Sequence, residues 1–160
     1  MLIRPATEAD VPACDEIYRA AKEFMHSNGN PDQWALAYPS GNDVMEGIAD
    51  GTSFVCEEGG EVIATFFYRI GADPTYSIIY DGKWLSDEKY GVIHRIAVKY
   101  QGRGIIGFIF DEMFKAHPNL RIDTHEDNLP MQRALSKAGF KYCGVIHLPD
   151  GAPRIAFQKI

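Results

Sequence analysis

The sequence has few features of a membrane, secreted or metal-binding protein. No apolar run in its 160 residues approaches the ~20 residues that a membrane-spanning helix needs, and the first residues lack the apolar core of a signal peptide. The three cysteines, Cys14, Cys56 and Cys143, are widely separated and match no zinc-binding spacing. We therefore expect a cytoplasmic protein with no metal site and no disulfide framework.

Basic side chains are also fewer than acidic ones. The chain has 16 Lys and Arg against 22 Asp and Glu, a net charge of -6. Nucleic acids and anionic membranes bind basic surfaces, so we expect neither as a partner, and a cationic partner is weakly favoured. A chain of this length with 46% hydrophobic residues suits a single domain over 1–160 with one core.

The first half of the chain predicts strands and helices with clear end signals. A first strand over 1–5 is followed by two helices, each opened by a capping-box spacing: Thr7 with Asp10, and Ser40 with Asp43. Two β-rich runs, TSFVCEE and EVIATFFYRI, then flank a Gly-Gly pair, which predicts an antiparallel hairpin. The fold class is therefore mixed α+β, a mostly antiparallel twisted sheet flanked by helices.

The second half begins with a long segment that shows no periodic pattern. Residues 71–89 predict a loop, with a short extra hairpin around Asp81–Gly82 as an option. Strands and helices alternate after it. The expected elements are strand 90–98, helix 104–116, strand 119–124, helix 129–138, strand 140–147 and a last strand after Asp150–Gly151.

Three glycines with the spacing G-x-G-x-x-G lie between a predicted strand and a predicted helix. They are Gly102, Gly104 and Gly107, and Asp123 follows about 20 residues later, where a dinucleotide-binding protein has its ribose-binding acid. Two features oppose that interpretation: Lys99–Gln101 separates the strand from the first glycine, and only 37 residues follow Asp123. The alternative is a loop whose backbone N–H groups bind a pyrophosphate without a nucleotide-specific acid.

The second interpretation matches a known family. The strand IHRIAV, the loop QGRG, the strand end DTHEDN and the segment NLPMQRALSKAGF resemble the GNAT superfamily of acyl-CoA-dependent N-acetyltransferases. The resemblance implies that the parallel strands 90–98 and 119–124 splay apart around acetyl-CoA. The family loop, Q/R-x-x-G-x-G/A, is represented by Gln101 and Gly104, but Ile106 stands where a small residue is usual.

The resemblance also assigns the residues that bind acetyl-CoA. The glycine loop and the helix start would bind the pyrophosphate, the strand before the loop would pair with pantetheine, and the Asn-to-Phe segment would contact the pantetheine arm. These residues are Ile96, Ala97, Val98, Gln101, Gly102, Arg103, Gly104, Ile105, Ile106, Gly107, Asn128 and Met131.

Attack of an amine on a thioester needs an oxyanion donor and a base. The resemblance assigns the donor to the backbone N–H of Val98. At pH 7 an amine of pKa about 10.4 costs about 4.6 kcal/mol to deprotonate, so a base matters. Asp123 and His94 are the two candidates; Asp123 could instead orient a loop, and His94 could be a packed core residue.

The acid and the acceptor pocket are less clearly marked. Many relatives have a tyrosine where this chain has Leu135, which leaves water, Tyr142 or no acid to protonate the thiolate. The acceptor pocket should come from the least patterned segments, whose aromatic side chains could equally bury a homodimer contact. The candidates for binding the acceptor are Trp34, Tyr68, Tyr80, Trp84 and Glu126.

We therefore expect an acyltransferase that moves an acetyl group from acetyl-CoA to a primary amine, on a small molecule or a peptide N-terminus, by direct attack. A non-catalytic acyl-CoA-binding module is the alternative, and a dinucleotide-dependent enzyme is a distant third.

Overall fold

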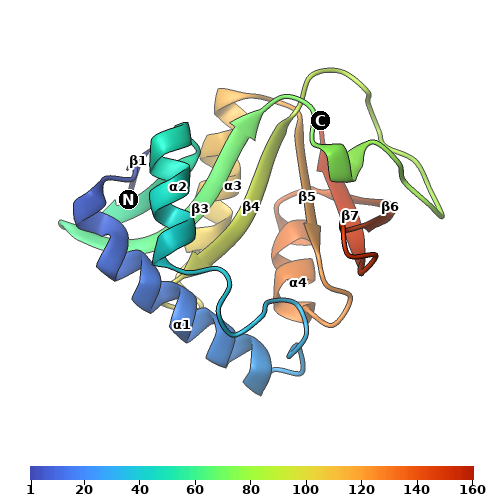
Figure 1. The fold of residues 1–160 in the computed structure, drawn as a ribbon. Coiled ribbons are helices and arrows are strands. Elements are labelled where there is room, and N and C mark those ends of the chain that lie inside the picture. Colours follow the sequence, from blue (N-terminus) through green and yellow to red (C-terminus); the bar gives the residue numbers. More distant parts are fainter.

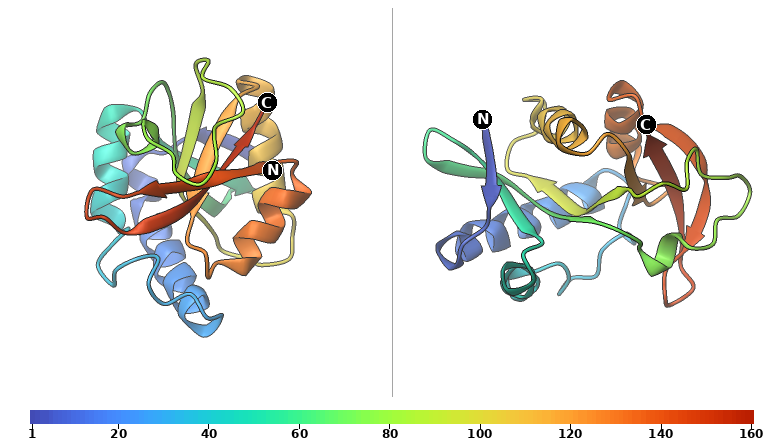
Figure 2. Two further views of the ribbon diagram at one scale, coloured as in Figure 1. Left: turned by 90° about the vertical axis from the view of Figure 1, so that its right-hand side faces the viewer. Right: turned by 90° about the horizontal axis from the view of Figure 1, so that it is seen from above.

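The computed structural model describes all 160 residues around one seven-stranded mixed sheet, in the order β1-β2-β3-β4-β5-β7-β6. Every neighbouring pair is antiparallel except β4 and β5, which are parallel. Helices α1 and α2 cover one face, and α3 and α4 cover the other (Figures 1 and 2). The predicted mixed α+β class is confirmed. None of the helices combines the length and the apolar character that crossing a membrane requires.

The predicted elements form close to their expected boundaries. The strands are β1 (Leu2–Pro5), β2 (Ser53–Glu58), β3 (Glu61–Ile70), β4 (Gly91–Val98), β5 (Leu120–Thr124), β6 (Lys141–His147) and β7 (Pro153–Lys159). The helices are α1 (Val11–Ser27), α2 (Gly41–Asp50), α3 (Ile105–Ala116) and α4 (Leu129–Lys137), with 3-10 turns η1 (Glu8–Asp10) and η2 (Pro74–Tyr76).

Both predicted capping boxes form. The backbone N–H of Thr7 donates to Asp10 Oδ2 at 2.8 Å, and that of Ser40 donates to Asp43 Oδ2 at 2.8 Å. The first box caps η1, which runs directly into α1, whereas the second opens α2 itself. The two helices therefore start where the sequence predicted, with a 3-10 turn added before the first.

The long loop before β4 differs from the prediction, because no extra hairpin forms at Asp81–Gly82. Instead, Tyr80 exchanges two backbone hydrogen bonds of 2.8 Å with Val145 of β6. The fully buried Gln158 of β7 also ties the loop to the sheet, since its side-chain oxygen accepts from the N–H of Leu85 at 2.7 Å. The loop is therefore ordered by contacts between residues far apart in the sequence, which no local pattern reveals.

The parallel strands β4 and β5 touch at only one end. Their ladder joins Gly91 to Leu120 and Val92 to Arg121, and beyond these two pairs the strands diverge (Figure 1). On its other edge, β4 stays paired with β3 as far as Val98. A wedge-shaped gap therefore opens in the middle of the sheet, as the resemblance implied.

A β-bulge lies in β4 beside this gap. The register with β3 shifts between His94 and Ala97, so β4 carries one extra residue there, and Arg95 takes a φ of +52°. Left-handed backbone costs a residue with a side chain about 1–2 kcal/mol. The fully buried Tyr18 of α1 donates its hydroxyl to the Arg95 carbonyl at 2.8 Å and so helps to hold the bulge.

We predict that Tyr18→Phe lowers the free energy of unfolding by about 1–3 kcal/mol, because the Arg95 carbonyl loses its hydroxyl partner. Urea unfolding measures this change. Tyr142→Phe is the matched control, since Tyr142 is 54% exposed and makes no side-chain hydrogen bond, and it should change stability by less than about 0.5 kcal/mol. Equal stability of the two variants would mean that Tyr18 does not support the bulge.

Candidate functional site

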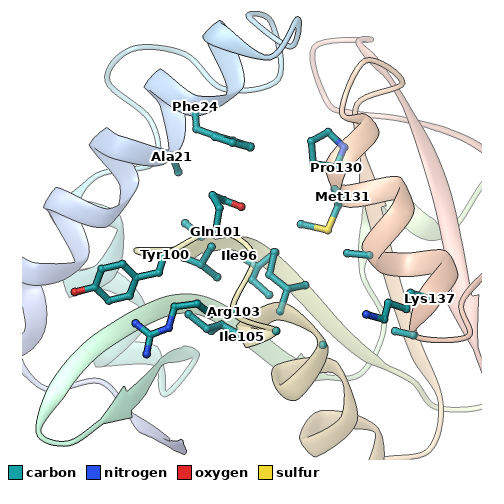
Figure 3. Close-up of a pocket in the computed structure, with 18 of the residues that line it drawn as sticks. Ala21, Phe24, Ile96, Tyr100, Gln101, Arg103, Ile105, Pro130, Met131 and Lys137 are labelled. Carbon is teal, nitrogen blue, oxygen red and sulfur yellow. The ribbon is translucent and has the colours of Figure 1, made fainter.

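A cavity of about 410 Å³ opens in the gap between α1, α4 and the loop that follows β4. Phe24 and Ala21 of α1 face it from one side, Pro130 and Met131 face it from the other, and the loop forms its floor (Figure 3). All twelve residues that the sequence assigned to acetyl-CoA line this cavity. The predicted set is therefore brought together in one place.

The loop after β4 presents a row of free backbone donors. No hydrogen bond within the protein uses the backbone N–H groups of residues 101–107. Gly102 and Gly104 take φ values of +73° and +72°, and α3 begins at the next residue with its positive dipole end at the loop. Free N–H groups at a helix N-terminus are a binding site for phosphate, so these residues fit the pyrophosphate of coenzyme A.

Ile106, which stands where the family pattern has a small residue, does not block the free N–H groups of the loop. Its partly buried side chain packs against the main core cluster, and its N–H remains free like those of its neighbours. A Cβ atom added at Gly107 would meet no other atom within 4 Å, so the space beside the helix start is open.

Cationic side chains surround the same loop. Arg103 pairs with Glu58 at 2.9 Å and Lys99 pairs with Glu61 at 3.2 Å, both on the β2–β3 hairpin. Lys137 of α4 also lines the cavity and forms no salt bridge. Lys137 is therefore the cation at this cavity without a carboxylate partner, and it could pair with a phosphate group, whereas Arg103 and Lys99 are already paired.

The backbone N–H of Val98 faces the gap. In an antiparallel pair, successive residues point their N–H groups alternately toward the partner strand and away from it. The N–H of Lys99 donates to Ile63 of β3 at 2.8 Å, so the N–H of Val98 points to the opposite edge of β4. That edge is where β5 has diverged, and a ligand in the gap can reach this donor.

A second cavity, of about 330 Å³, continues from the first. Four residues line both: Met25, Ile96, Asn128 and Met131. The second cavity also contains the two candidate bases, His94 of β4 and Asp123 of β5. The cavity lined by the predicted pantetheine-binding residues therefore adjoins the cavity of the candidate bases, at the point where β4 and β5 separate.

His94 lies within a chain of hydrogen-bonding groups. Its Nε2 is 2.8 Å from Asp73 Oδ2, and its Nδ1 is 3.8 Å from Asp123 Oδ1. The buried Tyr76 donates its hydroxyl to Asp123 Oδ1 at 2.6 Å. Two carboxylates therefore flank one imidazole, and each carboxylate has its own further partner.

The charge state of Asp73 determines how His94 can act. Burial raises the pKa of Asp73, but hydrogen bonds from His94 and Thr75 outweigh it and bring the pKa well below its usual range. Asp73 is therefore an acceptor, so Nε2 of His94 carries the proton that it donates to Asp73, and Nδ1 is the ring nitrogen that faces Asp123. Burial and the charge of Asp123 raise the pKa of Tyr76, which keeps its phenol protonated as a donor.

The acceptor residues expected from the sequence are spread over several places. Trp34 lines the second cavity, and Tyr68 lines a third cavity of about 340 Å³ on the other side of Asp73 and His94. The remaining three lie outside these cavities, since Tyr80 and Glu126 are exposed and Trp84 packs on Tyr76 at 5.3 Å.

The two positions discussed for a general acid also lie outside the cavities. Leu135 is fully buried in the main core cluster, and Tyr142 is 54% exposed with its ring against Phe157. Neither side chain can therefore protonate a leaving group in the gap.

Sequence reasoning missed several residues of the second cavity, among them Gln33, Asp73, Arg95 and Arg154. Asp73 had a local signal, the Asp-Pro-Thr turn that opens η2. Gln33 had none, because its role is to accept hydrogen bonds at 3.3 Å from Thr124 and 2.9 Å from Asn128, both about 90 positions away along the chain.

Comparison with known proteins agrees with this geometry. The sequence matches the Acetyltransferase (GNAT) family over residues 12–140. The chain belongs to this family. Acetyl-CoA is the cosubstrate of GNAT enzymes, which favours the pyrophosphate interpretation of the three glycines over the dinucleotide interpretation. No protein with a curated description matches the chain significantly.

Solved structures resemble the whole chain. A GNAT acetyltransferase from Streptococcus agalactiae is 34% identical, with a TM-score of 0.91 over 99% of this chain and 94% of that one. A ribosomal-protein-alanine N-acetyltransferase from Brucella melitensis is 22% identical, with a TM-score of 0.65 over 100% and 99%. The aminoglycoside acetyltransferase AAC(6')-Ib with coenzyme A and kanamycin is 22% identical, with a TM-score of 0.66 over 98% and 92%. The last two share the fold.

The glycine loop gives a matched pair of variants. Gly104→Ala should lower the free energy of unfolding by about 1–2 kcal/mol, because the φ of +72° disfavours a Cβ atom. Gly107→Ala lies within α3 with open space around it, so it should raise stability by about 0.5–1 kcal/mol. Urea unfolding of both variants tests this, and a stable Gly104→Ala variant would contradict the assigned loop conformation.

Proposed function

We propose that this GNAT acetyltransferase transfers an acetyl group from acetyl-CoA to a primary amine by direct attack. The observation that carries the proposal is the junction of the two cavities at Ile96, Asn128 and Met131. The loop with free N–H groups lies on one side of this junction, and the His94 cluster lies on the other. Acetyl-CoA supplies an acetyl thioester, and the second cavity receives the amine.

The chain's own groups provide the two polar functions that the transfer needs. The amine nitrogen bonds to the acetyl carbon as the carbon–sulfur bond breaks, and the amine gives up one proton. The N–H of Val98 donates to the carbonyl oxygen as negative charge develops there. The thiolate leaves and takes a proton from water, because neither Leu135 nor Tyr142 lines the cavities.

We assign the base to His94 rather than to Asp123. Asp73 holds Nε2 of His94, so Nδ1 is the ring nitrogen that is left to accept a proton from the amine. Asp123 already accepts the Tyr76 hydroxyl, and its remaining charge suits an ammonium group before the proton is lost. Asp123 therefore binds the substrate, while His94 takes the proton.

We predict that His94→Asn lowers kcat/KM at pH 7 by roughly 10²–10⁴-fold, as expected for the loss of a general base. Steady-state kinetics with one amine measures this change. His147→Asn, an exposed histidine outside the cavities, is the control, and a loss in His94→Asn no larger than that of the control would remove His94 as the base.

Asp123→Asn is predicted to act mainly on binding. It should raise KM for the amine more than it lowers kcat, because the carboxylate that pairs with the ammonium is lost. Steady-state kinetics on the same amine separates the two parameters. A large loss in kcat at unchanged KM would instead identify Asp123 as the base.

The proposed reaction is tested by following thiol release from acetyl-CoA with a panel of primary amines. Acetyl-CoA at about a hundred times its Kd should also stabilise the fold by about 2.7 kcal/mol. Cys143→Ala should keep its turnover, since direct attack uses no cysteine. Stabilisation by acetyl-CoA without thiol release for any amine would instead favour a non-catalytic acyl-CoA-binding module.

A further inference from the structure

A buried arginine in the second cavity has no acidic partner. Arg154, the second residue of β7, is only 7% exposed and lines the cavity with His94 and Asp123. Its Nη1 donates to the carbonyl of Pro153 at 2.8 Å and its Nη2 donates to that of Gln33 at 3.0 Å. It forms no salt bridge, although charged side chains are rarely buried unless they are paired.

The other buried arginine shows how this chain normally neutralises such a charge. Arg121 is 3% exposed, and its guanidinium lies 4.0 Å from the ring centre of Trp84 and 3.9 Å from that of Tyr90. Asp87 is 3.6 Å from it. Arg121 thus has aromatic faces and a carboxylate, whereas Arg154 has only two neutral carbonyl groups and borders an open cavity.

A second guanidinium without a carboxylate lines the same cavity. Arg95, on the bulge of β4, lies over the rings of Phe67 at 4.2 Å and Tyr38 at 5.0 Å and forms no salt bridge. The acidic groups of the cavity are Asp123 and Asp73, and Asp73 is bonded to His94 and lies 3.4 Å from Arg69. The cavity therefore offers both a carboxylate for an ammonium group and two guanidinium groups without a salt bridge for an anion.

We propose that the acceptor is a small zwitterion, an amine that also carries an anionic group such as a carboxylate, and that Arg154 binds the anionic group. This inference rests on the proposed acetyl transfer and specifies its substrate class. A guanidinium donates to a carboxylate or phosphate through paired N–H groups, which gives direction as well as attraction. The cavity of about 330 Å³ suits a molecule of amino-acid size.

The same charges disfavour an acceptor with several ammonium groups. A second ammonium group within the cavity would lie near Arg95 and Arg154, and like charges repel strongly where water is excluded. The neighbouring third cavity does carry Asp43, Glu46 and Asp50. A diamine is therefore the informative competitor, because its second charge could reach that acidic cavity instead.

The test is a comparison of kcat/KM by thiol release for matched acceptors on the wild-type enzyme. The panel contains ω-amino acids of increasing chain length, their amides, the corresponding aminoalkyl phosphonates and diamines. At the best chain length, the acid or the phosphonate should exceed its amide by at least 10-fold. Either anion exceeding the amide supports the proposal, and the larger value identifies the anionic group.

The Arg154→Gln variant tests whether Arg154 causes the preference for the anionic acceptor. Its kcat/KM should fall at least 10-fold more for the anionic acceptor than for the amide, whereas Arg133→Gln, an exposed arginine of α4, should leave both values unchanged. Because Arg154 also binds the Gln33 carbonyl, Arg154→Lys is measured beside it; a retained charge should keep part of the preference.

Three results would overturn the inference. They are equal rates for acid and amide in the wild type, faster acetylation of the diamine, and an Arg154→Gln enzyme that retains the full preference. In each of these cases amines still release thiol, so the proposed function stands and only the substrate class fails. If no amine releases thiol, the proposed function fails, and the inference fails with it.

Discussion

The short contact between β4 and β5 is the constraint on which the rest of the molecule depends. Because only two residue pairs join these strands, the sheet opens on the glycine-loop side of Val92 and exposes the inner edge of β4. The bulge at Arg95 lies on the same strand, and Tyr18 holds it from α1. Backbone donors at Val98 and in the glycine loop are left without partners inside the protein, and a ligand in the gap can use them.

The two cavities differ in the charged groups that line them, although the whole chain has a net charge of -6. The cavity beside the glycine loop offers N–H groups, a helix dipole and the basic side chains of Arg103 and Lys137, all of which favour phosphate. The cavity beside His94 combines carboxylates with guanidinium groups. The net charge of the protein therefore says little about either ligand, since the relevant charges are placed locally by single residues on β4, β5 and β7.

The sequence predicted the cofactor side of the site better than the acceptor side. Residues 96–107 lie in one continuous strand-loop-helix segment, so their glycine spacing carries the information, and all of them except Lys99 line the cavity. Asp73 and Arg154 come together with His94 and Asp123 only through the sheet order, which pairs β5 with β7. Tyr80 and Trp84 lie in an unpatterned loop whose anchor, Gln158, could not be inferred locally. The aromatic content of that loop was therefore a poor guide to the acceptor pocket.

The central claim is that the gap between β4 and β5 holds the thioester at the junction of the two cavities. A crystal structure of the protein with coenzyme A tests it most directly. We expect the pyrophosphate at the N–H groups of residues 101–107 and the sulfur beside Ile96, Asn128 and Met131, facing His94. A pantetheine arm outside the gap, or a sulfur remote from His94, would contradict the account.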